Sequence, residues 1–156
     1  NPSMCGAAAL FTQNKILLNI GGFMNELSVP ALICDYLSDS KLGVFIPEVR
    51  RDGCAAVFLE ASPSEIKTYI DGSYIESVPF EICVQCAGEG AGERLGAVSF
   101  FESVDRYAAD NPVNTEKYGI CDAFIKRTSG ISKSAVFDNG TEEYRAAYRF
   151  TCRTKG

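Results

Sequence analysis

The chain has 156 residues, 46% of them hydrophobic and 11% aromatic, and its formal net charge is −5 at pH 7. This composition excludes a disordered chain, and the acidic balance argues against a general nucleic-acid binder or an anionic membrane partner, since both require clustered lysine and arginine. Histidine is absent, which excludes histidine-dependent nucleophiles, metal sites and proton relays within this chain.

A chain of this length predicts a single domain. Residues 1–23 contain no helical pattern, and the first such pattern begins only after Met24. We therefore expect an N-terminal extension at 1–23, with Met24 as a candidate native start, followed by one domain at 24–156. Seven cysteines, an odd number spread along the chain, predict reduced thiols in a cytoplasm rather than a disulfide framework.

The first half of the domain predicts a helix, two short strands and a hairpin. Ser28 and Pro30 supply a capping hydroxyl and a proline that the first helical turn tolerates, so we expect a helix over 28–40. Asp71-Gly72 is a dipeptide that favours a tight turn, because glycine readily adopts the positive φ that such a turn needs. The expected strands lie at 43–49 and 55–61, and the hairpin runs from Lys67 to Cys86.

The second half predicts a longer helix followed by strands. Apolar residues keep a helical period from about Glu93 to Ala109, and Asn111-Pro112 ends the pattern. A strand is expected within 118–127, and a second hairpin turns at residues 138–141. The last segment alternates aromatic residues with arginines, which is typical of a half-buried strand. The fold class that we expect is α+β, with a mostly antiparallel β-sheet and two main helices packed on one face.

Cys83 and Cys86 form a C-x-x-C pair, which raises the question of a metal or redox site. A structural zinc site needs four ligands, commonly from two such pairs, and only one pair is present. Residues three apart in a strand point to opposite faces, so the two thiols should diverge. We therefore interpret them as strand cysteines and predict no bound metal.

The glycine-rich stretch at 87–96 resembles a phosphate-binding loop only superficially. Its glycines do not satisfy G-x-G-x-x-G, and no Gly-Lys-Ser/Thr follows. Glu89 and Glu93 would oppose a phosphate, whereas they favour a helix N-terminus because its dipole is positive. We expect a strand end, a loop and a helix start, without a cofactor.

Two further patterns suggest chemistry and have simpler interpretations. Glu142 and Glu143 are adjacent in a strand and face opposite ways, so we expect a solvated turn rather than an acid/base pair. Arg145, Arg149 and Arg153 are too few for a nucleic-acid site, and we expect them to meet acidic side chains across the sheet or on a neighbouring subunit. The sequence therefore predicts no catalytic, cofactor-binding or metal-binding residue and no enzyme.

Three segments resemble the minor capsid or tail-terminator proteins that long-tailed bacteriophages and prophages encode. In that family a hairpin leads into a long strand, a helix begins with paired phenylalanines, and a final strand carries alternating aromatic residues. The resemblance covers most of residues 28–154 and includes no active-site signature. The segments are IKTYIDGSYIESVPFEI (66–82), AVSFFESVDRYAAD (97–110) and SAVFDNGTEEYRAAYRFTCR (134–153).

The resemblance implies a structural protein of the virion, assembled in the cytoplasm of the bacterial host. Tail terminators are similar in forming a ring that caps the tail tube, ends its polymerisation and joins tail to head. The implied partners are further copies of the chain, as a ring such as a hexamer, together with the tail tube protein and the head–tail connector. No sequence-specific nucleic acid and no membrane partner are implied.

The charges divide in a way that a ring contact could use. The region around the second helix is acidic and the C-terminal third is more basic, which predicts a head-to-tail contact between copies. The acidic set is Glu89, Glu93, Glu102, Asp105 and Asp110, and the basic set is Lys126, Arg127, Lys133, Arg145, Arg149, Arg153 and Lys155. Two alternatives stay open, namely a cytoplasmic small-ligand-binding domain or enzyme that uses the 87–96 loop, and a monomeric adaptor.

Overall fold

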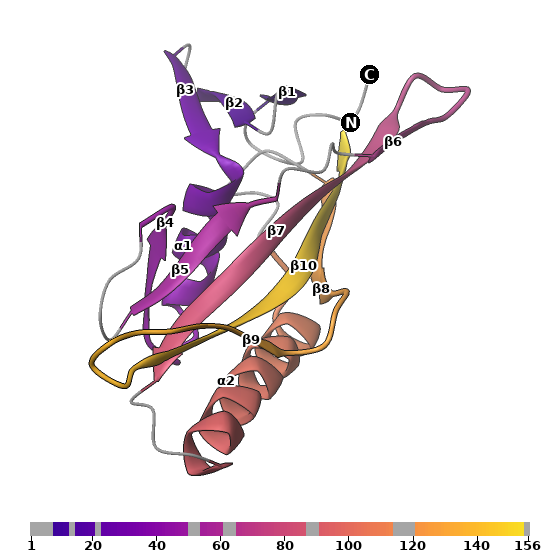
Figure 1. Ribbon diagram of the computed structural model, residues 1–156. Helices are drawn as coiled ribbons and strands as arrows, with labels where there is room; N and C mark the ends of the chain where they lie inside the picture. Colours follow the sequence, from indigo (N-terminus) through magenta and orange to yellow (C-terminus); the bar gives the residue numbers. More distant parts are fainter. Residues whose placement is uncertain are drawn as a thin grey trace.

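The computed structural model describes residues 8–12, 15–20, 23–49, 54–60, 65–86, 91–113 and 121–154. Within them the chain forms two helices and ten strands (Figure 1). The helices are α1 (Val29–Ser38) and α2 (Ala91–Asp110). The strands are β1 (Ala8–Thr12), β2 (Lys15–Ile20), β3 (Phe23–Ser28), β4 (Val44–Pro47), β5 (Cys54–Leu59), β6 (Glu65–Thr68), β7 (Tyr74–Cys86), β8 (Cys121–Arg127), β9 (Ser132–Val136) and β10 (Glu142–Thr154).

The main sheet has seven strands in the order β4-β5-β7-β10-β8, with β6 paired to β7 and β9 paired to β10. Only β4 and β5 run parallel, and every other pair is antiparallel. The centre is the pair β7 and β10, which match residue for residue from Tyr74–Thr154 to Cys86–Glu142. The prediction of an α+β fold with a mostly antiparallel sheet is confirmed.

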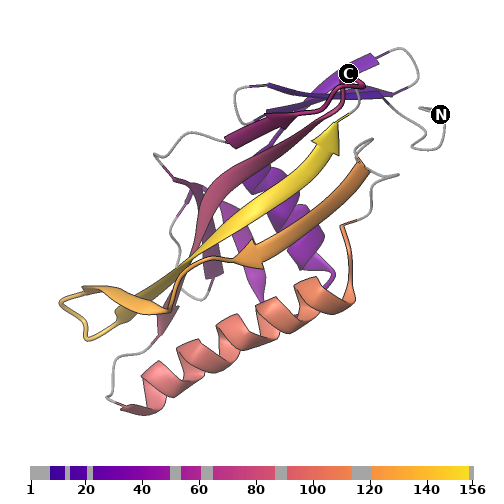
Figure 2. The same cartoon turned by 90° about the vertical axis from the view of Figure 1, so that its right-hand side faces the viewer.

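Both helices pack on one face of this sheet, which we call the core face (Figure 2). Alternate residues of β7 and β10 point into the core, because successive strand residues face opposite sides. Phe80 of β7 stacks on Tyr148 of β10 with ring centroids 5.6 Å apart, and Phe101 of α2 lies 6.5 Å from Tyr148. Leu32 of α1 belongs to the same buried cluster. The opposite side of the sheet is called the outer face.

The turn chemistry read from the sequence is also confirmed. Gly72 and Gly140 both adopt φ +86°, a value that residues with a Cβ rarely take. The N–H of Gly72 donates to the carbonyl of Tyr69, and that of Gly140 donates to the carbonyl of Phe137. The two hairpins therefore turn at the predicted dipeptides.

The sequence did not predict the second sheet, which consists of β1, β2 and β3. These antiparallel strands lie within and just after the segment expected to be an extension. Ser28 is the last residue of β3, and α1 follows it at once from Val29. Residues 16–18 are a continuous apolar run without alternation, so periodicity could not distinguish strand from helix there. Within the described part of the chain, no helix is long and apolar enough to cross a membrane.

Candidate interaction surfaces

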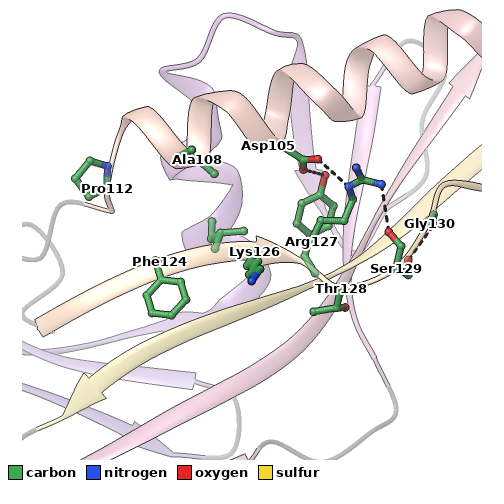
Figure 3. A pocket seen from close by; sticks show the side chains of 12 residues that line it. Asp105, Ala108, Pro112, Phe124, Lys126, Arg127, Thr128, Ser129 and Gly130 are labelled. Atoms are coloured by element: carbon green, nitrogen blue, oxygen red, sulfur yellow. Dashed lines mark hydrogen bonds and ion pairs between the residues drawn. The ribbon is translucent and has the colours of Figure 1, made fainter.

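A groove of about 780 Å³ lies between the C-terminal half of α2 and β8 (Figure 3). Its apolar wall includes Ala108, Ala109 and Pro112 at the end of α2. Phe124 and Lys126 of β8 form the opposite rim, and the ring of Phe124 is 49% exposed. Because β8 is the last strand of the sheet order, this groove runs along a sheet edge.

A hydrogen-bonded network fixes one end of the groove. The Asp105 carboxylate of α2 accepts hydrogen bonds from Arg127 Nε at 2.7 Å and from the Tyr148 hydroxyl at 2.8 Å. Arg127 Nη1 also donates to the carbonyl of Ser129 at 3.2 Å. Burial and the negative charge of Asp105 raise the pKa of Tyr148, so its phenol stays protonated and remains a donor. These groups satisfy one another and tie α2 to β8 and β10, which is a structural role.

The arginine row of β10 lies on the outer face. Arg145 Nη1 is 3.6 Å from a carboxylate oxygen of Glu81 on β7. Arg153 Nη2 is 3.7 Å from Asp71 in the β6–β7 turn. These two contacts confirm that the arginines meet acidic side chains across the sheet. Arg149 lies at 3.4 Å from the hydroxyl of Ser77.

Much of the predicted charge division is neutralised within one chain. Asp105 of the acidic set pairs with Arg127 of the basic set, and Lys133 lies 3.5 Å from Glu142. Surface ion pairs of this kind contribute little stability, yet they reduce the charge that is left for a neighbour. Glu102 and Asp110 are exposed. In the acidic set, Glu89 and the side chain of Glu93 lie outside the described part of the chain. In the basic set, Lys155 lies outside it.

Two hairpins carry exposed apolar side chains at opposite ends of the long β7–β10 pair. Ile66 of β6 is 60% exposed, and Ile70 at the β6–β7 turn is fully exposed. Val136 of β9 is 63% exposed, and Phe137 follows it at the β9–β10 turn. The strand pair has 13 residues on each side, so about 40 Å separates its ends. Figure 1 shows the two hairpins projecting from opposite ends of the sheet.

The C-x-x-C pair behaves as the strand geometry predicts. β7 continues without a break to Cys86. Cys83 is buried opposite Ala56 of β5, and neither residue belongs to the core-face cluster. Cys86 packs against that cluster, so the two thiols point to opposite faces. They cannot bind one ion together in this fold.

Part of the glycine-rich stretch at 87–96 can be compared with the groove. Residues 87–90 lie outside the described part of the chain, and Gly92 and Gly96 are already within α2. The groove is at the other end of that helix, beyond Asp105. The described part of the stretch, residues 91–96, therefore does not line the groove.

The expectation of a solvated turn at Glu142 and Glu143 was wrong. Glu143 is buried, and its Oε1 accepts a hydrogen bond from the Ser134 hydroxyl at 2.9 Å. Glu142 accepts a hydrogen bond from the hydroxyl of Tyr144, which lowers the pKa of Glu142, with a smaller contribution from Lys133. The physical reason is that β10 is already flanked here by β7 and β9. The two carboxylates still face opposite ways.

Sequence reasoning missed the groove and its network. Asp105 and Arg127 appeared only as members of two charge sets, and Tyr148 only as a strand residue. A usable signal was the pair of small residues Ala108-Ala109 before a helix stop, because small residues at a helix end leave space beside a strand.

No protein-family model matches the chain. A search among curated proteins gives no significant match.

Proposed function

We propose that the chain is a structural subunit of a phage virion that acts in tail termination and head–tail joining. In this proposal several copies form a ring that caps the tail tube and ends its polymerisation. The resembling segments 66–82, 97–110 and 134–153 coincide with the β6–β7 hairpin, most of α2 and the β9–β10 hairpin. Of these elements, α2 forms one wall of the groove and the two hairpins carry exposed apolar side chains, so the resemblance includes surfaces that assembly would use.

The observation that carries the proposal is that one subunit presents two different surfaces at opposite edges of its sheet. The α2–β8 groove lies beside β10, whereas the β6 strand with exposed Ile66 lies beside β7. A closed ring requires such a heterologous contact, in which one surface of each copy meets a different surface of the next. An acidic net charge also suits a ring through which DNA passes, since the subunits would not retain the phosphates.

The small-ligand alternative gains little from the geometry. The groove volume lies in the range of ligand pockets, but Asp105, Arg127 and Tyr148 in its lining already bond to one another. The groove also does not involve the 87–96 loop that this alternative uses. A ring subunit accounts for the exposed edge and the projecting hairpins, whereas a ligand pocket accounts for neither.

The first prediction tests assembly. At high protein concentration we expect light scattering to show closed oligomers, because each contact alone is weak and ring closure adds avidity. The measurement should be made at low and at high salt, because salt screens contacts between charges. Since many charges are already paired within the chain, we expect apolar and backbone contacts to dominate the interface. A mixture with tail tubes that lack their terminator should show the protein at one tube end by electron microscopy. A strict monomer under all conditions that also leaves tail tubes uncapped contradicts the proposal.

A further inference from the structure

Two open strand edges flank the β7–β10 pair at the same end of that pair. One edge lies beside β7 and the other lies beside β10. β6 pairs with residues 74–77 of β7, and these pair in turn with residues 151–154 of β10. β8 pairs with β10 over residues 148–153. The local order is therefore β6-β7-β10-β8. Among the described residues, no strand pairs with the far edge of β6 or of β8.

The directions of these strands allow identical copies to continue one sheet. Each neighbouring pair in β6-β7-β10-β8 is antiparallel, so β6 and β8 run antiparallel to each other. When copies repeat side by side around a ring, β8 of one copy meets β6 of the next. That meeting is again antiparallel, and no strand has to reverse.

The backbone groups of β8 that face the open edge can be identified from its last hydrogen bond. The N–H of Thr128 donates to the carbonyl of Ala147, so Thr128 faces β10. Backbone groups alternate in direction along a strand. Ile125 and Arg127 therefore direct their N–H and C=O away from β10, toward the open edge.

The same alternation applies to β6. The N–H of Tyr69 donates to the carbonyl of Ser73 in the β6–β7 hairpin, so Tyr69 faces β7. Ile66 and Thr68 stand three positions and one position before it, respectively, and direct their backbone groups to the open edge. Both edges thus offer unpaired donors and acceptors, which in proteins serve as templates for strand pairing.

The core face and the charges of the edge residues guide the choice of register. Ile66 shares the core face with Glu76, its partner on β7, and Ile125 shares that face with Phe150 of β10. Pairing Ile66 with Ile125 keeps both on the core face, where Ile66 meets the apolar groove wall. A shift of two residues toward the C-terminal end of β8 would instead place Lys67 opposite Lys126, which is unfavourable.

The selected register also pairs complementary residues on the outer face. Lys67 stands opposite Phe124, whose exposed ring can accept a cation–π contact. This cation–π complementarity, together with the matching strand directions, identifies a second copy of the chain as the partner.

We propose that the β6 edge of one copy pairs antiparallel with the β8 edge of the next, with Ile66 opposite Ile125 and seated in the α2–β8 groove. The inference rests on the proposed ring and names the contact that would close it. The continuous sheet would replace exposed edges with backbone hydrogen bonds and would cover Ile66 and Phe124.

The second prediction uses one variant on each side of the contact and a matched control. Ile66→Lys places a charge on the strand edge, and Ala109→Lys fills the groove. Val136→Lys is the control, because Val136 is also an edge-strand residue and its exposure of 63% matches the 60% of Ile66. We expect Ile66→Lys and Ala109→Lys to be monomers by light scattering, with Val136→Lys assembling like the wild type. Thermal midpoints close to that of the wild type show that the variants are folded.

Mixing the two interface variants gives a sharper result. Ile66→Lys keeps an intact groove, and Ala109→Lys keeps an intact β6 edge, so one sound contact can form between them. We expect the mixture to give dimers and no larger species. Hydrogen exchange of wild-type protein should slow by about tenfold or more on assembly at Ile66, Thr68, Ala123 and Ile125. The inward-facing amides of Lys67 and Lys126 should be protected in both states.

The outcomes separate this inference from the proposed function. If wild type, Ile66→Lys and Ala109→Lys all assemble, the strand contact is wrong while the ring proposal stands. If Val136→Lys also dissociates the ring, the contact includes the other hairpin and the proposed pairing is wrong. If the wild type is always monomeric and Ile66→Lys loses tail-tube binding, the β6 edge meets the tube protein instead of a second copy. If the wild type neither assembles nor binds tail tubes, the ring proposal fails first.

Discussion

Asp105 shows how a single carboxylate holds the groove in shape. It receives the Tyr148 hydroxyl and the Arg127 guanidinium, so one helix residue orients groups from two strands. Arg127 and Asp105 are each just over a quarter exposed, which limits the value of their ion pair. The hydroxyl of Tyr148 is different because its residue is almost completely buried. Losing its acceptor should therefore matter more than losing the ion pair.

The third prediction follows from this difference. Asp105→Ala should lower the free energy of unfolding by about 1–3 kcal/mol, because the buried Tyr148 hydroxyl loses its acceptor. Tyr148→Phe should cost less, about 1 kcal/mol, since it removes the donor and leaves Asp105 paired with Arg127. Urea unfolding measures both. The double variant should cost less than the sum of the single changes, and strict additivity would show that the hydrogen bond contributes nothing.

Glu143 illustrates what a local reading of residues cannot supply. The nearby Asp138-Asn139-Gly140-Thr141 turn made a solvated carboxylate reasonable, and the turn itself is correct. The burial of Glu143 instead depends on its two neighbouring strands, β7 and β9. β7 is distant in the sequence, and β9 is a separate strand before the turn. Cys83 and Cys86 were predictable, because the opposite directions of their side chains follow from strand geometry alone.

Among the elements, the hairpins and helices followed from local sequence signals, while the N-terminal sheet did not. Asp-Gly, Asn-Gly and the helical period are short-range features, so they could be read without knowing the fold. The α2–β8 groove could not be read in this way. β7 pairs with β10 although α2, β8 and β9 lie between them in the sequence. Because β7 occupies one side of β10, β8 pairs on the other side and becomes an edge strand.

The fourth prediction contrasts two glycines. A Cβ at Gly72 or at Gly96 would meet no atom within 4 Å, so packing cannot distinguish them. Gly72 has φ +86°, and alanine there should destabilise the β6–β7 hairpin by about 1 kcal/mol. Gly96 lies within α2, and alanine there should stabilise the chain by about 0.5–1 kcal/mol. Thermal unfolding of the two variants should shift in opposite directions, and equal shifts would contradict the backbone explanation.

At the scale of the whole molecule, β1–β3 form a sheet apart from the seven-stranded one. Among the residues that the structure describes, no backbone pair of the main sheet involves a position before Val44. Removing β1 and β2 opens no ladder in the main sheet, although β3 loses its partner β2. The domain expected at 24–156 is thus a reasonable unit to test.

The fifth prediction is that a chain beginning at Met24 unfolds cooperatively with a Tm within about 4 °C of the full chain, which corresponds to about 1 kcal/mol for this size. The reason is that the main sheet keeps all its backbone pairs. Differential scanning calorimetry measures the shift. A fall well beyond this range would show that the N-terminal sheet contributes to the main core.

The end-to-end pairing of β7 with β10 also has a consequence for how the chain folds. Its two partners become neighbours only after the polypeptide has closed a long loop that contains α2, β8 and β9. Loop closure of this kind costs conformational entropy before any contact repays it, so folding is expected in the millisecond-to-second range rather than faster. Until β10 arrives, one side of β7 stays unsatisfied and can recruit strands from other nascent chains. A protein that assembles by its sheet edges thus carries, in its slowest folding step, the same chemistry that could misdirect it into aggregates.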